Sequence, residues 1–423
     1  MATKKRIGYL GVFVAALLVS AGLHWVWHLL EADAPIFEQT LKPTVTTCLP
    51  PFCDEPQQQL DTSLLPHGKG RELLPGSQDA APSGVAYIED LPEPSISIAP
   101  VPGGHAMLNP THTVCVHDPI DDTGAQLGIM AAWQQTALKE SDFRPKLVVY
   151  TNADIALADF KAGKCQAAWL PGGLKESVLP ALDTLEAFGA VPTREHAWVI
   201  LQVLSSPANG AESYRSNDKY DLMGVTFAGP TYLMFNKPVA GGALPERLRE
   251  LSLVTVNDQQ AQFAAAMGAT AVPANREVAA TKFNNGSVGA MFATIDMLDL
   301  LELRKGLEPE GAIYAVPLFE SAYGLVVDKD DFSQEQKDWT REFFFDAVDP
   351  QIAKRVVEEQ EVLKELPAIQ LSSGELEVLE DRLQQLRLSV RDRELYSQAT
   401  LILMRKCRCK LDASRDECIN PVE

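Results

Sequence analysis

The sequence predicts an α/β protein with two lobes, preceded by a membrane-spanning segment and a linker. From Thr113 onward, short apolar runs alternate with helical patterns, which is typical of parallel strands covered by helices. One helix-to-strand sequence occurs twice, and long apolar runs separate the two copies. With 423 residues, 46% of them hydrophobic and 22% charged, the chain has the size and composition of a globular protein with one or two domains.

Residues 1–30 are expected to form a transmembrane helix. A basic segment at residues 4–6 precedes an uncharged run over 7–30, and a bilayer-spanning helix needs roughly 20 apolar residues. The alternative is a signal peptide cleaved near residues 32–34, but the apolar core of such a peptide is usually shorter. We favour an uncleaved signal anchor. Because basic flanks stay in the cytoplasm, the bulk of the chain is then expected in the periplasm, anchored to the inner membrane.

Residues 31–112 are expected to form a periplasmic tether. Prolines are concentrated here together with Gly, Ser and Gln, and neither a helical nor a strand period persists. Proline-rich stretches of this kind favour extended geometry and hold the following domain away from the membrane. The net charge of -20 and the pI near 4.8 argue against nucleic acid as a partner, because phosphate backbones require clustered Lys and Arg.

The first lobe is expected to alternate strand, helix, strand, helix and strand. These elements are predicted over residues 114–116, 128–140, 146–150, 153–163 and 166–170. The second lobe begins with a short helix and repeats the alternation. Its elements are predicted over residues 245–251, 253–257, 258–268, 270–272, 276–286 and 288–294.

The repeated sequence marks the same joint in both lobes. FKAGKCQAAWL at residues 160–170 aligns without a gap on FNNGSVGAMFA at residues 283–293. The shared positions are a phenylalanine, a glycine and an upstream asparagine: Phe160, Gly163 and Asn152 in the first copy, and Phe283, Gly286 and Asn275 in the second. Glycine takes the left-handed turn that ends a helix, so each copy predicts a helix that ends before a buried strand.

Extended segments are expected to connect the lobes. An apolar stretch at residues 195–206 and a second at residues 224–236 lie between them, and residues 312–318 and 323–329 are expected to return as strands. Two lobes joined by crossing strands leave a cleft at the carboxyl ends of their strands, where α/β sheets bind ligands.

The C-terminal part, over residues 333–407, is expected to be helical. Capping boxes at residues 333–336 and 372–375 predict two helix starts. Leucines and Val390 then recur with a 3,4 spacing over residues 376–390. We expect this stripe to pack across the lobes, and a coiled-coil dimer is the alternative.

The seven cysteines are expected to form disulfides in an oxidising compartment, because their spacing does not match a zinc array. The expected pairs are Cys48 with Cys53, Cys115 with Cys165, and Cys409 with Cys418. Cys407 is left over, either free or paired between chains.

Several segments resemble a known family. They are VCVHDPI at 114–120, ADFKAGKCQAAWLPG at 158–172, FAGPTYLMFN at 227–236, TKFNNGSVGAMFA at 281–293 and RKCRCKLDASRDEC at 405–418. Over residues 113–418 the chain resembles an uncharacterised proteobacterial family of solute-binding proteins. That family is similar to the periplasmic binding subunits of tripartite ATP-independent (TRAP) transporters. The resemblance implies a Venus-flytrap fold, with hinge strands and long C-terminal helices that brace both lobes.

The chain departs from this family in two ways. Family members usually begin with a cleaved signal and little linker, whereas an anchor and a tether are predicted here. TRAP binding proteins also commonly clamp a ligand carboxylate with an arginine of the second lobe, and Val254 occupies its place in this sequence. An organic acid bound in that way is therefore not expected.

Ligand-binding residues are expected at the strand ends that face the cleft. The candidates are Asp118, Asp121, Asp122, Gly172, Thr231, Tyr232, Asn257, Asp258, Thr294 and Asp296. The three aspartates after the first strand could face a cation, an amine or sugar hydroxyls. The alternative is that they cap the next helix, and each other candidate could equally be a turn or cap residue.

No catalytic, cofactor or metal motif is present: the sequence has no GxSxG, HExxH, P-loop or GxGxxG element in the required context. We therefore expect a membrane-anchored periplasmic solute-binding protein, with residues 113–423 as the binding domain and its second lobe over roughly 240–315. The alternative is a structural or regulatory subunit of an envelope complex. An open polar cleft would support solute capture, and a cleft filled by apolar side chains would contradict it.

Overall fold

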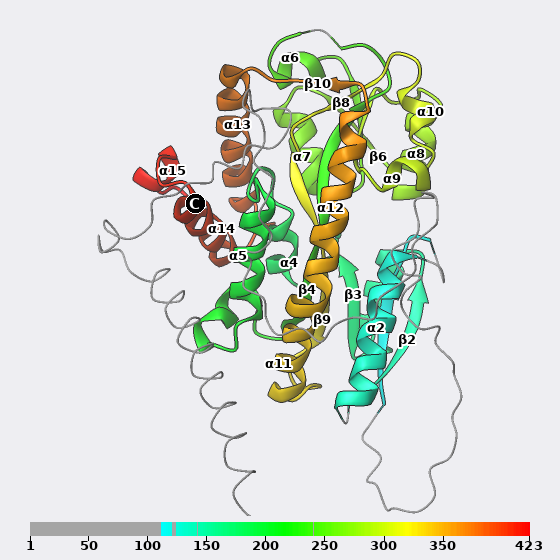
Figure 1. The fold of residues 1–423 in the computed structure, drawn as a ribbon, viewed down its shortest axis with the longest axis vertical. Helices are drawn as coiled ribbons and strands as arrows, with labels where there is room; N and C mark the ends of the chain where they lie inside the picture. The colour runs from blue at the N-terminus through cyan, green and yellow to red at the C-terminus, as the bar shows by residue number, and fades with distance from the viewer. Residues whose placement is uncertain (1–110, 121–123, 142, 240) are drawn as a thin grey trace, which may run out of the picture.

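The computed structural model describes residues 111–120, 124–141, 143–239 and 241–423 (Figure 1). The expected anchor, the tether up to residue 110 and the Cys48–Cys53 pair lie outside these residues. Within the described part, no helix combines the length and the apolar character needed to cross a membrane.

Within the described residues, ten strands form one continuous sheet, whose main path runs β2-β1-β3-β9-β4-β7-β5-β6. The first lobe contributes three parallel strands: β1 (Thr111–His117), β2 (Arg144–Tyr150) and β3 (Ala167–Pro171). The second lobe contributes three more: β5 (Ser252–Thr255), β6 (Thr270–Pro273) and β7 (Ala290–Thr294). The other strands are β4 (Tyr220–Phe235), β9 (Phe319–Asp328) and the short β8 (Ala312–Tyr314) and β10 (Ala368–Ile369).

The long strands β4 and β9 join the lobes. They pair antiparallel from Tyr220 opposite Asp328 to Thr231 opposite Phe319. On one side β9 pairs with β3 of the first lobe, and on the other side β4 pairs with β7 of the second. The expected hinge strands are therefore present, and the sheet passes from one lobe to the other without a break.

Helices cover the sheet in three groups. Between β1 and β4 lie α2 (Ala125–Glu140), α3 (Ala153–Lys161), α4 (Pro180–Leu185), α5 (Arg194–Ser205) and the 3-10 helix η2 (Asn209–Tyr214). Between β4 and β9 lie α6 (Leu244–Leu248), α7 (Asp258–Ala266), α8 (Arg276–Asn284), α9 (Met297–Leu300) and α10 (Arg304–Leu307). After β9 follow α11 (Gln334–Phe343), the π-helix η3 (Phe344–Val348), α12 (Asp349–Lys364), α13 (Ser373–Arg391), α14 (Gln398–Leu411) and α15 (Asp416–Ile419).

The repeated joint is confirmed in both lobes. The side chains of Asn152 and Asn275 cap α3 and α8 by accepting hydrogen bonds from the third backbone amide of each helix. Gly163 and Gly286 both have φ 75°, the left-handed conformation expected after a helix. The phenylalanine of each copy is buried against its sheet.

The expectation for residues 195–206 was wrong, because this stretch forms α5 rather than an extended connection. Thr193 caps it by accepting a hydrogen bond from the His196 amide at 3.5 Å. A continuous apolar run is compatible with a buried strand or a buried helix, and periodicity alone does not separate them. Here the 12-residue length and the threonine cap favour the helix.

The C-terminal helices brace both lobes. Both expected capping boxes form, at Ser333 with Gln336 and at Ser372 with Glu375. Helix α12 runs along the centre of the molecule across both lobes, whereas α13 and α14 lie together to its left (Figure 1). The leucine stripe of α13 is buried in the same core as side chains of both lobes, so it packs within this chain.

Two expected disulfides form, Cys115–Cys165 within the first lobe and Cys409–Cys418 near the C-terminus. The thiol of Cys407 is free and buried. Burial raises the pKa of this thiol to about 12 and keeps it un-ionised.

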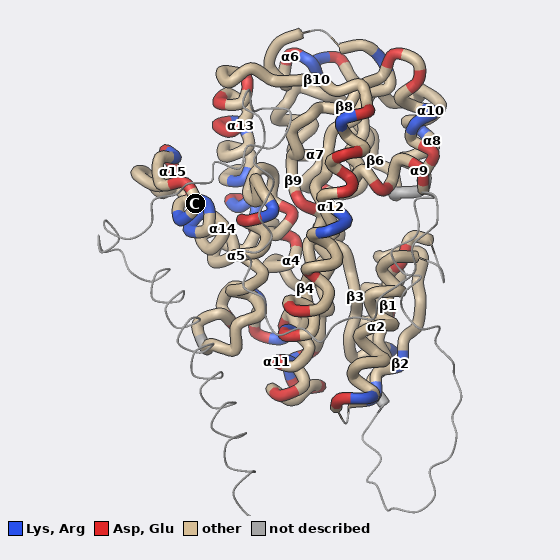
Figure 2. The backbone as a smooth tube through the Cα atoms, viewed as in Figure 1, with Lys and Arg blue, Asp and Glu red and all other residues tan. Residues whose placement is uncertain are grey.

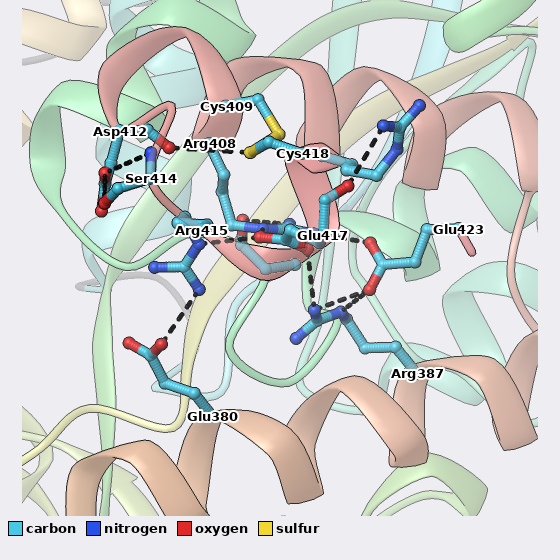
Figure 3. Close-up of polar contacts among 12 residues, drawn as sticks. Glu380, Arg387, Arg408, Cys409, Asp412, Ser414, Arg415, Glu417, Cys418 and Glu423 are labelled. Carbon is cyan, nitrogen blue, oxygen red and sulfur yellow. Dashed lines mark hydrogen bonds and ion pairs between the residues drawn. A yellow bond between two sulfur atoms is a disulfide. The ribbon is translucent and has the colours of Figure 1, made fainter. Parts of the chain in front are cut away.

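An ion network fastens the C-terminal segment (Figure 3). Arg408 bonds Glu417 at 2.7 Å and Glu423 at 2.5 Å, and Arg387 bonds Glu423 at 2.6 Å. The two guanidiniums also donate to the carbonyls of Phe188 and Ala190, so the network reaches the segment after α4. Burial opposes ionisation of Glu417, but the hydrogen bonds and charges of the surrounding arginines outweigh it and lower its pKa to about 2.

Replacement of Arg408 by alanine tests this network. Arg408→Ala leaves two buried carboxylates without their main partner and is expected to lower the free energy of unfolding by about 3–5 kcal/mol. Urea unfolding of the full-length chain measures the change. Arg382→Ala, at an exposed position of α13, is the matched control and is expected to stay within about 0.5 kcal/mol of the wild type. Equal unfolding midpoints for the two variants would contradict the role of the network.

Candidate functional site at the seam between the lobes

The lobes touch where β3 and β5 end. Gly173 follows β3, and Asn257 follows β5 in the second lobe. A Cβ atom on Gly173 would lie only 2.4 Å from Nδ2 of Asn257, and its φ of 71° also favours glycine. A side chain at this position would therefore displace the side chain of Asn257 and would strain the backbone.

Two buried carboxylates from the α4 region line the first-lobe side of this contact. The Gly173 amide donates to Oδ1 of Asp183 at 2.7 Å, and the Ala322 amide donates to Oε1 of Glu186 at 2.9 Å. Glu186 also lies directly against Gly172. Burial raises the pKa of Asp183 to about 7, the nearby Glu186 adds to this rise, and hydrogen bonds from Ser177 and Gly173 oppose it.

Helix α7 provides the second-lobe side. Nε2 of Gln259 donates to the Asp183 carbonyl at 3.2 Å, and the Tyr396 hydroxyl donates to Oε1 of Gln259 at 3.1 Å. This chain of hydrogen bonds ties α7, α4 and the turn after α13 together. Between them lies a cavity of about 100 Å³, lined by Gly173, Leu174, Lys175, Ser177, Pro180, Asp183, Asp258, Gln259, Glu394 and Leu395.

An aromatic cluster fills the seam next to the polar groups. The ring of Phe188, from the segment after α4, stacks on Phe263 of α7 with centroids 4.7 Å apart. It also packs against Phe292 of β7 and Phe319 of β9. Phe263 lies one turn beyond Gln259 on α7, so this apolar contact and the polar cavity adjoin.

A second polar cluster lies on the opposite face of β4, beneath α12. Nε of Arg355 lies 3.1 Å from Oε1 of Glu359, and Nη1 of Arg355 lies 3.9 Å from Oδ2 of Asp296. Neither carboxylate oxygen of Glu359 accepts a hydrogen bond from the described residues. Burial raises the pKa values of Glu320 and Glu359 to about 8. Figure 2 shows acidic and basic segments together on α12 where it passes the centre of the sheet.

Comparisons with known proteins agree with this architecture. Residues 125–422 match the family model described as solute-binding protein AdeT 1/2. The chain belongs to this solute-binding protein family. The probable solute-binding protein AdeT1 of Acinetobacter baumannii is 24% identical over 279 residues, which cover 64% of this chain and 88% of that protein.

Solved structures share the fold of this solute-binding protein. The periplasmic ectoine-binding protein of the TeaABC TRAP transporter from Halomonas elongata superposes with a TM-score of 0.56 at 14% identity, over 72% of this chain and 100% of that one. A marine-metagenome TRAP solute-binding protein specific for aromatic acids gives 0.55 at 13% identity, over 72% and 99%. The two-lobed fold and the family resemblance expected from the sequence are thus confirmed.

Within this solute-binding protein, three predicted site residues lie at or beside the seam. Gly172 lies against Glu186, Asn257 lies against Gly173, and Asp258 lines the cavity. The side chain of Asn257 also caps α7 by accepting a hydrogen bond from the Gln260 amide at 2.9 Å. Thr231 and Thr294 are paired across β4 and β7, and Thr294 bonds Asp296.

The other predicted residues are placed differently. Tyr232 points to the α12 face of β4, where its neighbours are Glu320 and Glu359. Asp118 is fully buried and accepts hydrogen bonds from the amides of Ile120 and Leu127 at 2.9 and 2.8 Å. It thus holds the start of α2, as in the capping alternative. Asp121 and Asp122 lie outside the described residues.

Sequence reasoning missed Asp183, Glu186 and Gln259. The signal was present: two acidic residues interrupt the otherwise apolar run LPALDTLEAFGAV at residues 179–191. Charged residues are rarely buried without a partner or a function, so this interruption marks a place where they are needed. Their position opposite α7 could not be read from the local sequence.

The raised pKa of Asp183 predicts that the free energy of unfolding falls as the pH rises. The folded state holds a proton up to about pH 7, whereas the unfolded chain releases it near the ordinary value of 3.8. Stability from this group is therefore fully present below about pH 4 and is lost as pH rises through 7, by on the order of a few kcal/mol. The unfolding free energy of the wild type is expected to fall between pH 5 and pH 8. In Asp183→Asn this fall is expected to be smaller by that amount.

Urea unfolding at the two pH values measures the effect. Asp154→Asn, in the first turn of α3 and exposed, is the control and should keep the wild-type pH dependence. If Asp183→Asn also kept it, the buried carboxylate would not be the source.

Proposed function

We propose that this protein captures a small polar solute between its lobes in the periplasm, anchored to the inner membrane, and presents the closed form to a membrane transporter. Membership of a solute-binding protein family supports capture, and both the fold and the two disulfides suit the periplasm. The uncharged run over residues 7–30 supports the anchor.

The charges at the seam favour a cationic solute. Three acidic side chains line the cavity, the buried Asp183 and the exposed Asp258 and Glu394, and Glu186 lies beside it. The one basic side chain of the lining is the exposed Lys175. Val254, which occupies the place of the carboxylate-clamping arginine, is buried in β5 and offers no charge. An ammonium group would neutralise the carboxylate of Asp183, which is otherwise costly to bury. This acidic lining is the observation that carries the proposal.

Closure follows from the contacts across the seam. A solute that touches Asp183 of the first lobe and Asp258 of the second gains both interactions only when the lobes are together. Such differential binding shifts the population toward the closed form, in which Gln259 bonds the Asp183 carbonyl. The proposed transporter would then recognise the closed arrangement of the lobes.

The aromatic cluster favours a second candidate, a structural or regulatory subunit of an envelope complex that carries no transported ligand. Phe188 occupies part of the seam with the protein's own apolar side chain. In that case the lobes would remain closed whether or not a solute is present.

Ligand titration separates the two candidates. The full-length protein, purified in detergent, is expected to bind aliphatic diamines such as 1,3-diaminopropane and not dicarboxylates such as succinate. Asp258→Asn removes one carboxylate and is expected to weaken diamine binding by about 10-fold to 100-fold, as for the loss of a charge-assisted hydrogen bond. Isothermal titration calorimetry measures both.

Asp154→Asn provides the matched control, because it also removes an acidic residue from the first turn of a helix, but from α3, which does not line the cavity. Its diamine affinity should equal that of the wild type. If amines, amino acids, sugars and organic acids all failed to raise the melting temperature, solute capture would be abandoned for the second candidate.

A further inference from the structure

A larger groove lies beside the seam cavity. It has a volume of about 530 Å³ and is formed by the start of α4, the two residues Ser216 and Asn217, and the turn between α13 and α14. Pro180 and Glu394 line both the groove and the 100 Å³ cavity. The two spaces are therefore neighbours, separated at these two side chains.

The turn that forms the outer wall is held in place from both lobes. Tyr396 is buried and bonds Gln259 of α7, and the Ser397 amide donates to Oγ1 of Thr184 in α4 at 2.8 Å. The groove is thus attached to the same two helices that close the seam. A ligand that reached into it would be bound by the same closed arrangement.

Glu394, at the boundary between the groove and the cavity, is acidic like Asp183 and Asp258, which line the cavity. Glu394 is exposed, and the described residues donate no hydrogen bond to its carboxylate. The basic side chain that lines the groove, Arg391, is already engaged: it bonds Asp392 at 2.8 Å and the Val422 carbonyl at 2.6 Å. Arg393, which directly precedes Glu394, is exposed and lines neither the groove nor the cavity. A free carboxylate therefore lies at the boundary between the spaces, in line with Asp183 and Asp258 inside.

We infer that the groove is the outer part of the solute site and that the solute is an elongated polyamine. One ammonium group lies among Asp183 and Asp258 in the cavity, and the chain passes Pro180 so that a second ammonium pairs with Glu394 and the remainder lies in the groove. This inference rests on the proposed capture of a cationic solute and adds its length and the position of its second charge.

Comparison of a short and a long amine tests the inference. Spermidine is expected to bind the full-length protein with a Kd at least about 10-fold lower than that of 1,3-diaminopropane. One additional charge-assisted hydrogen bond, here to Glu394, corresponds to a change in Kd of this size. Gln398→Trp places a large ring in the groove from an exposed position at the start of α14. It is expected to abolish the spermidine advantage and to leave diaminopropane affinity unchanged.

Gln385→Trp, at an exposed position of α13 outside the groove, is the matched control and should retain the full advantage. Glu394→Gln changes charge with little change in volume and is a second variant, expected to reduce the spermidine advantage even if the tryptophan variant folds poorly. Calorimetry gives the affinities, and thermal unfolding verifies folding.

The outcomes separate the two proposals. If diaminopropane binds but spermidine binds no more tightly, or if both groove variants keep the advantage, the extended site is overturned and solute capture stands. If neither amine binds the wild type, capture of a cation fails and the inference fails with it.

Discussion

The antiparallel pairing of β4 with β9 is the constraint on which the rest of the structure depends. Both strands run through both lobes, and each carries a neighbour from a different lobe, β3 on β9 and β7 on β4. A rotation of the lobes would therefore have to twist or bend these two strands, and would also involve the C-terminal helices that brace both lobes. The proposed closure would bend this pair while its ladder of backbone hydrogen bonds keeps the two lobes in one sheet.

The two faces of this strand pair carry different chemistry. On one face the polar cavity and the Phe188 cluster share the seam between α4 and α7. On the other, α12 covers a cluster of buried acidic and basic side chains around Arg355. Buried carboxylates with raised pKa values lower stability at neutral pH, and such costs are concentrated at sites that bind or move. Their placement on both sides of the hinge strands agrees with a protein whose lobes close on a solute.

Much of the fold could be predicted because its signals are local. The asparagine cap, the phenylalanine and the glycine of the repeated joint each act within one helix turn, so their meaning does not depend on distant residues. The capping boxes at Ser333 and Ser372 formed for the same reason. Helix α5 was mispredicted because its run over residues 195–206 is mostly apolar. The less buried positions of this run, Glu195, Trp198, Gln202 and Ser205, recur at a 3,4 spacing but include only one charged residue, so the helical period is weak in the sequence.

By itself, then, the sequence determined the alternation of strands and helices within each lobe, the division into two lobes and two disulfides. Only the tertiary structure decided which polar residues meet. Asp118 accepts hydrogen bonds at the start of α2, whereas Asp183, Glu186 and Gln259 lie close together at the seam between the lobes. Helix caps and turns are set by neighbours in the chain, but a binding site is set by contacts between distant segments. Asp183 and Gln259 are 76 residues apart in the chain, so their contact depends on the arrangement of the two lobes around β4 and β9.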